Sequence, residues 1–104
     1  MTPVIVLTTA GTAFDVAALA RELVEQRLAA CVNIIPRIES IYRWQGRIET
    51  DAEQLLLIKT TEERAEALRA VLMARHPYDV PEFVVIRMDD AAGPWREWLI
   101  ESVE

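Results

Sequence analysis

Residues 37–59 read RIESIYRWQGRIETDAEQLLLIK, and this segment is the most informative about the architecture. Its first part alternates, so a strand would place residues 38, 40, 42 and 44 on one face and residues 37, 39, 41 and 43 on the other. Gln45-Gly46 then forms a plausible two-residue turn, because glycine readily adopts the positive φ that such turns need. The stretch predicts a β-hairpin with arms at 37–44 and 47–59.

The predicted hairpin is too long for the domain that carries it. Its longer arm would span on the order of 40 Å at ~3.3 Å per residue, and an isolated two-stranded ribbon is only marginally stable. A second copy of the chain is the simplest cover. We therefore expect self-association, with Tyr42 and Trp44 of the hairpin tip at the interface. Because proline cannot donate to the ladder, Pro36 predicts that the first strand of the hairpin is bulged there or has a free edge. In the alternative, the first arm breaks at Pro36 and the second near Thr50-Asp51, leaving ordinary strands with an exposed tip.

The remaining elements follow from hydrophobic periodicity and turn residues. They are a strand at 4–9, a helix from Thr12 to about Leu28, a helix between Thr60 and Pro77, a strand at 83–86 and a terminal helix from Pro94. Thr12 with Asp15, and Thr60 with Glu63, have the spacing of capping boxes. The order β-α-β-β-α-β plus a helix predicts one α+β domain over 1–104. This is a ferredoxin-like split βαβ sandwich with four antiparallel strands and both main helices on one face.

Composition excludes several classes of protein. Hydrophobic residues make up 52% and charged residues 27% of 104, which excludes intrinsic disorder. Eleven basic residues against 17 acidic ones give a net charge of −6, which argues against nucleic acid and anionic membranes as partners. A single cysteine cannot form an intramolecular disulfide, and neither a signal sequence nor a membrane span is recognisable. We expect a soluble, cytoplasmic protein.

The segment from His76 to Glu82, HPYDVPE, gathers an imidazole, a phenol and two carboxylates between two prolines. Such a rigid loop could hold ligands for a metal or polar groups for a small molecule. In the alternative it only ends a helix and starts a strand, with His76 favourably placed at the helix C-terminus. Cys31 likewise has two interpretations, an inert buried thiol or a soft ligand for copper or zinc.

An enzyme is not indicated. The chain has no nucleophile elbow, no glycine-rich phosphate loop and no second histidine. Lys59 could meet an anion at the start of the second helix, or it could be a charge that ends a strand.

Four segments resemble the signature segments of the CutA family of divalent-cation tolerance proteins, in the family's order and spacing. They are ACVNIIP at 30–36, SIYRWQG at 40–46, KTT at 59–61 and HPYDVPE at 76–82. The resemblance implies a ferredoxin-like fold that assembles as a tight homotrimer, similar in architecture to the PII signalling proteins. It also implies a link to tolerance of copper and other divalent ions.

The family's metal-binding residues carry over only in part. Some members have a cysteine where this chain has Thr8, and a pair of histidines where it has Arg75-His76. His76 and Cys31 are thus the candidate ligands for copper or another divalent ion. The leading hypothesis is a non-enzymatic trimer that binds such an ion. The alternatives are a PII-like module that binds a small ligand between subunits through Lys59, Tyr78 and Glu82, and a structural scaffold trimer.

Overall fold

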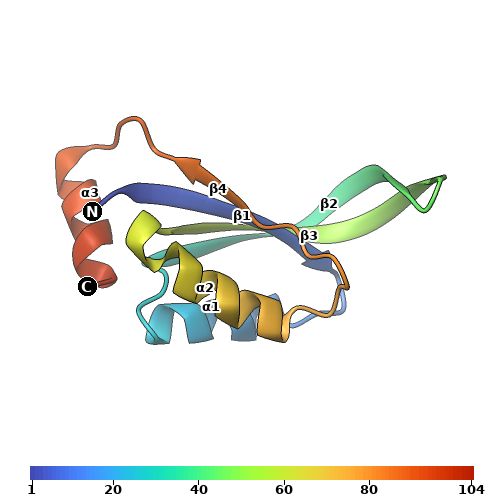
Figure 1. The fold of residues 1–104 in the computed structure, drawn as a ribbon, viewed down its shortest axis with the longest axis horizontal. Helices are drawn as coiled ribbons and strands as arrows, with labels where there is room; N and C mark the ends of the chain where they lie inside the picture. The colour runs from blue at the N-terminus through green and yellow to red at the C-terminus, as the bar shows by residue number, and fades with distance from the viewer.

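The computed structural model describes all 104 residues as one four-stranded sheet with three helices. In chain order the elements are β1 (Pro3–Gly11), α1 (Val16–Glu25), β2 (Cys31–Trp44), β3 (Arg47–Thr61), α2 (Glu62–Arg75), β4 (Val84–Arg87) and α3 (Gly93–Ser102). The strand order is β2-β3-β1-β4, and every neighbouring pair is antiparallel. Helices α1 and α2 lie together on one face of the sheet (Figure 1). The predicted ferredoxin-like architecture is confirmed.

The core lies between that face and the two helices. Alternate residues of β1, among them Val4 and Val6, are completely buried and belong to one cluster with Leu23 of α1 and Leu68 and Leu72 of α2. Burial of each such side chain stabilises the fold by roughly 1.5–3 kcal/mol. This alternation fixes the register of β1, because a slip of one residue would turn its apolar side chains away from the helices.

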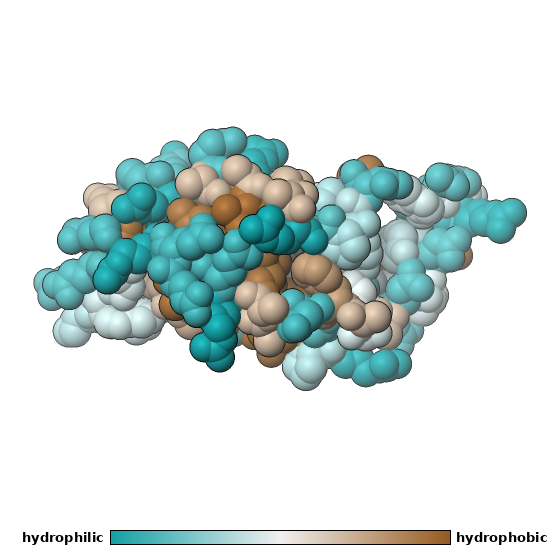
Figure 2. Space-filling view, turned by 90° about the horizontal axis from the view of Figure 1, so that it is seen from below, coloured by the Kyte–Doolittle hydropathy of each residue, from teal (hydrophilic) through white to brown (hydrophobic).

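The hairpin of β2 and β3 is continuous to its tip. Gln45 and Gly46 have φ values of 50° and 78°, as a type I′ turn requires. The ladder is interrupted only between Ile35 and Ile38, where the register shifts around Pro36. The predicted turn and bulge are therefore confirmed, and the second arm does not break at Thr50-Asp51. The hairpin projects beyond the helices as a narrow ribbon (Figure 1) and is mainly hydrophilic when viewed from the helix side (Figure 2).

The helix starts differ from the predicted capping boxes. Asp15 caps α1 by accepting a hydrogen bond from Ala18 N at 3.1 Å, so the cap lies three residues later than Thr12. Thr60 is not a cap, because its hydroxyl donates to Leu28 O at 2.7 Å. Glu63 instead accepts a hydrogen bond from Thr2 N at 3.0 Å. Both capping-box predictions were wrong: at α1 the cap is the neighbouring residue Asp15, and at α2 groups distant in the sequence bind the side chains of Thr60 and Glu63.

The face of the sheet opposite α1 and α2 carries no helix over most of its area (Figure 1). The strand register places a set of mainly apolar side chains on this open face. They are Ile5 and Leu7 of β1, Ile35 of β2, Leu55 and Leu57 of β3, and Val84 and Ile86 of β4. Ile35, Val84 and Ile86 are 38–45% exposed. This face is therefore an unsatisfied apolar surface within a single chain.

Helix α3 closes one end of the sheet. Leu99 and Val103 are completely buried there and pack with Ala30. Arg64 Nε donates to Val103 O at 2.6 Å and ties this end of the chain to α2. Trp95 and Trp98 remain substantially exposed. None of the three helices combines the length and the apolar character needed to cross a membrane.

Candidate functional site

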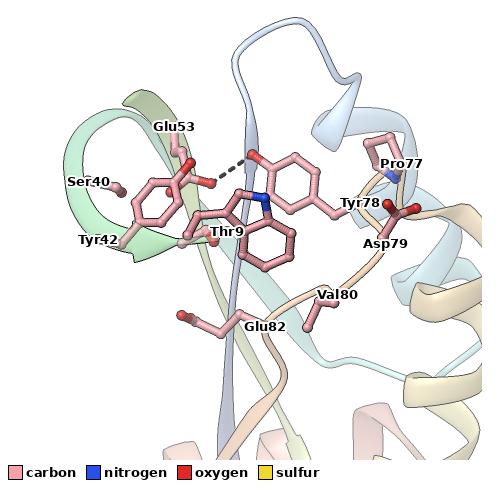
Figure 3. Close-up of a pocket in the computed structure, with 10 residues that line it drawn as sticks. Thr9, Ser40, Tyr42, Glu53, Pro77, Tyr78, Asp79, Val80 and Glu82 are labelled. Carbon is pink, nitrogen blue, oxygen red and sulfur yellow. Dashed lines mark hydrogen bonds between the residues drawn. The ribbon is translucent and has the colours of Figure 1, made fainter. Parts of the chain in front are cut away.

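A cavity of about 540 Å³ lies where the hairpin leaves the body of the protein. We call it the hairpin pocket. It lies between β2, β3, the end of β1 and the segment between α2 and β4 (Figure 3). Its lining comprises Thr9, Ser40, Tyr42, Trp44, Glu53, Pro77, Tyr78, Asp79, Val80 and Glu82. The structure thus joins the hairpin residues Tyr42 and Trp44 to the predicted ligand residues Tyr78 and Glu82.

Glu53 and Tyr78 form a polar contact at one wall of the pocket. The Tyr78 hydroxyl donates to Glu53 Oε2 at 2.7 Å, as the dashed line in Figure 3 marks. Glu53 is only 7% exposed. Burial raises the pKa of Tyr78 well above its usual value, and the hydrogen bond to the Glu53 carboxylate raises this pKa further. The phenol therefore stays protonated and remains a donor to Glu53.

Tyr42 is held in the same way on the outer part of the hairpin. Its hydroxyl donates to Asp51 Oδ2 of the opposing strand. That hydrogen bond is the main cause that raises the pKa of Tyr42 to about 12, with further contributions from desolvation and from the charges of Asp51, Glu53 and Glu49. Both phenols of the pocket are therefore neutral at physiological pH and lie in a negative field.

His76 supports the pocket from behind rather than facing it. Its Nε2 lies 2.7 Å from Thr9 O, and its Nδ1 accepts a hydrogen bond from Tyr78 N at 3.1 Å. An Nδ1 that accepts leaves the proton on Nε2, so Nε2 donates to the Thr9 carbonyl. The ring is 8% exposed and lies beside Phe14 and Tyr78, with centroids 6.0 and 4.7 Å away. Both nitrogens are thus occupied, and the imidazole positions the segment that carries Tyr78.

Two positions, Thr8 and Arg75, depart from the family's metal pattern. Thr8 is buried, and Arg75 is engaged in an ion pair. Thr8 is 1% exposed, and no partner accepts or donates to its hydroxyl. Arg75 forms an ion pair with Glu22 at 2.8 Å, which joins α2 to α1 and lowers the pKa of Glu22. Arg75 therefore links the two helices instead of supplying a metal ligand beside His76.

Cys31 and Lys59 lie away from the pocket. They face each other in the β2–β3 register, whereas Thr9 pairs with Leu55, four residues further along β3. That offset corresponds to on the order of 13 Å. Asn33 Oδ1 accepts a hydrogen bond from Lys59 Nζ and lies 3.7 Å from Cys31 Sγ. The structure thus does not bring Lys59 to the predicted ligand residues.

The predicted metal ligands His76 and Cys31 are also not brought together within one chain. Cys31 is half-buried at its own end of the sheet. Nowhere in the chain do three or more His, Cys, Asp or Glu side chains gather as a group that could hold a metal ion.

Glu53 is the site residue that sequence reasoning missed. It lies on the same side of β3 as Leu55 and Leu57, but also on the same side as the charged residues Asp51 and Lys59. The alternation pattern therefore gave no signal that this carboxylate is buried, because its burial depends on Tyr78 from a distant part of the chain.

Comparison with known proteins agrees with this architecture. The CutA1 divalent ion tolerance protein family matches residues 4–102. The divalent-cation tolerance protein CutA of Thermus thermophilus is 48% identical over 84 residues, 81% of this chain and 82% of that protein. Chloroplastic CutA of Arabidopsis thaliana is 44% identical over 84 residues, 81% of this chain but 46% of that protein. The chain thus spans about half the length of the chloroplastic relatives it matches.

Solved structures superpose closely. Cut A1 of Thermus thermophilus has a TM-score of 0.93 at 42% identity, covering 98% of this chain and 99% of the other. The PII-like protein CutA of Nostoc sp. PCC 7120, solved in apo form, has a TM-score of 0.89 at 32% identity, covering 97% of each chain. These findings confirm the resemblance seen in the four sequence segments. This chain belongs to the CutA1 divalent ion tolerance family.

Proposed function

We propose that this protein is a non-enzymatic homotrimer that binds a small ligand in the hairpin pocket. The observation that carries the proposal is the pocket itself, whose volume of about 540 Å³ and mixture of aromatic walls with a few convergent polar groups are typical of ligand sites. The description of the Nostoc neighbour as PII-like supports a ligand-binding role on the same architecture.

Self-association is supported by the open face and the projecting hairpin. A single chain leaves this apolar face in water, and further copies of the chain would cover it. Sedimentation should give three times the chain mass of 11.8 kDa. Ile86→Glu on the open face should dissociate the assembly. Val85→Glu, on the opposite side of β4 and similarly exposed, should leave it intact.

Ligand binding is tested by thermal-shift screening of small metabolites, followed by calorimetric titration of the compounds that stabilise the protein. The informative pair of variants is Trp44→Leu and Trp98→Leu. Both indoles are 44% exposed, but only Trp44 lines the pocket. Trp44→Leu should abolish the ligand-dependent shift while Trp98→Leu preserves it. Equal behaviour of the two variants would contradict the assignment of the pocket.

Divalent-cation binding is a second candidate. It is supported by the family's name. The pocket lining contains the carboxylates of Glu53, Asp79 and Glu82, but these do not gather as a group that could hold a metal ion. Titration with copper and zinc distinguishes a site in the pocket from a site at His76 and Cys31. It compares three proteins: the wild type, the Glu53→Gln variant, and a double variant with His76→Ala and Cys31→Ser. Weaker binding in Glu53→Gln places the ion in the pocket. Weaker binding only in the double variant places it at the ligands predicted from the sequence. Affinity unchanged in both variants would refute metal binding at either site.

A further inference from the structure

The residues that one chain contributes to the hairpin pocket make it negatively charged. Three of its ten lining residues are carboxylates, and none is lysine, arginine or histidine. Asp51, bonded to Tyr42, adds a fourth negative charge at the margin. The raised pKa values of both tyrosines agree with this field, because nearby carboxylates contribute to each. The pocket therefore favours a cation over an anion.

Glu53 is the carboxylate of the pocket that most needs a positively charged partner. Glu53 as a residue is only 7% exposed, yet none of the chain's three ion pairs includes it, and its one hydrogen-bond donor is the neutral Tyr78 hydroxyl on Oε2. A buried carboxylate without a countercharge is costly. A cationic ligand at Oε1 would supply the missing charge.

The aromatic side chains favour an organic cation. Tyr42, Trp44 and Tyr78 line the same cavity, and aromatic faces attract ammonium groups while covering the methylene groups attached to them. A bare metal ion gains little from aromatic walls, because neutral aromatic rings do not supply the ligand atoms that it needs. It would also need a preassembled group of ligands, which the chain lacks, or a phenolate, which the raised pKa values of the tyrosines disfavour.

The position of the carboxylates favours more than one ammonium group. Glu53 enters the pocket from β3, whereas Glu82 enters from the segment before β4, and Figure 3 shows them on two sides of the aromatic rings. A flexible chain with an amine at each end could satisfy both carboxylates and lay its methylene groups against the rings.

We propose that the hairpin pocket binds an aliphatic diamine or polyamine, with one ammonium group at Glu53, a second toward Glu82, and the carbon chain along Tyr42 and Trp44. This inference rests on the proposed ligand-binding function and names its ligand class.

The test is calorimetric titration of the full assembled protein with four probes. Butane-1,4-diamine should bind saturably at one per chain. Butylamine, with one ammonium group, should bind at least tenfold more weakly. Succinate, with carboxylates on the same four-carbon chain, should not bind. Magnesium chloride supplies two charges without a carbon chain and should also bind at least tenfold more weakly.

Matched variants locate the site. Glu53→Gln should weaken diamine binding at least tenfold, and Glu82→Gln, at an exposed position that leaves folding unaffected, should weaken it severalfold. Glu39→Gln removes the same charge from the opposite side of β2 and should leave affinity within twofold. Equal losses in Glu39→Gln and Glu53→Gln, or equal binding of butylamine and the diamine, would overturn the proposal.

The two proposals fail differently. If the diamine does not bind but another small molecule does so in a Trp44-dependent manner, the ligand class is wrong and the ligand-binding function stands. If no compound stabilises the wild type and the Trp44 and Trp98 variants behave alike, both are wrong.

Discussion

The hydroxyl of Tyr78 lies 2.7 Å from Glu53 Oε2 and donates a hydrogen bond to it, joining two parts of the chain that are 25 residues apart. Tyr78 belongs to the segment after α2, and Glu53 belongs to the arm of the hairpin where β3 still pairs with β1. The contact therefore fastens the base of the projecting hairpin to the segment that follows α2. Any ligand of the pocket would act directly on this junction.

We expect Tyr78→Phe to lower the free energy of unfolding by about 1 kcal/mol, because the buried Glu53 carboxylate loses its donor. The figure lies below the roughly 1.5–3 kcal/mol typical of hydrogen bonds to charged groups, since Tyr78 is itself 39% exposed and water can partly replace its hydroxyl. Tyr42→Phe is the matched control. It removes a hydroxyl that bonds the exposed Asp51 and should cost less. Urea unfolding at one fixed protein concentration measures both, and a larger loss for Tyr42→Phe would contradict this account.

The two tyrosines also predict how stability depends on pH. The pKa of each is higher in the folded protein than the usual value near 10, so folding favours the protonated phenol. Their contribution to stability is therefore complete below pH 10 and is lost as the pH rises through the folded values. Tyr42 and Tyr78 are the chain's two tyrosines, so the pH-dependent rise in absorbance at 295 nm reports on their ionisation. At about pH 10.5 the native protein should show little tyrosinate, whereas the urea-unfolded chain should be largely ionised. Equal tyrosinate in both states would contradict the raised pKa values.

His76 should be found as the Nε2–H tautomer. The Tyr78 N–H can only donate, so it requires a lone pair on Nδ1, and the Thr9 carbonyl can only accept, so it requires the proton on Nε2. Long-range ¹H–¹⁵N correlation spectra at pH 8 give the tautomer directly, and the chain's single histidine makes assignment unambiguous. An Nδ1–H tautomer would show that Nε2 is free to bind a metal ion.

Replacing the His76 side chain tests how much its two hydrogen bonds contribute to the free energy of unfolding. His76→Ala leaves both the Thr9 carbonyl and the Tyr78 N–H without a partner at a buried position, which should cost about 2 kcal/mol. A loss well below that, measured by urea unfolding, would mean that the imidazole does not hold this segment in place.

The sequence predicted the features that depend on local backbone chemistry. Gln45-Gly46 specified the turn, Pro36 the bulge and Pro77 the end of α2, because each acts on φ, ψ or a missing N–H within one or two residues. The same reasoning failed at Thr60 and Glu63, whose partners, Leu28 and Thr2, lie 32 and 61 residues away. The spacing of neighbouring residues cannot reveal hydrogen-bond partners that are so distant in the sequence.

The candidate site was predicted only in part for the same reason. Tyr42, Trp44, Tyr78 and Glu82 were recognised by residue type, but the sequence placed them in two separate roles. Their meeting in one pocket depends on where the segment after α2 crosses the hairpin, which is a tertiary relationship. For Lys59 and Cys31 the error was the reverse. Their residue types suggested that they belong to a binding site, but they lie on the open face at the far end of the sheet, away from the pocket.

The turn at the hairpin tip gives the last prediction. Gly46 has φ +78°, a region that an L residue with a Cβ enters only at a cost, although no atom lies within 4 Å of where that Cβ would be. Gly46→Ala should therefore lower the free energy of unfolding by about 1 kcal/mol through backbone strain alone. Gly93→Ala also adds a methyl group in open space, but at an ordinary φ at the start of α3, and should leave stability equal or slightly higher. Urea unfolding of the two variants at the same concentration separates strain from crowding. A loss in Gly93→Ala that matches the loss in Gly46→Ala would show that the left-handed conformation is not the cause.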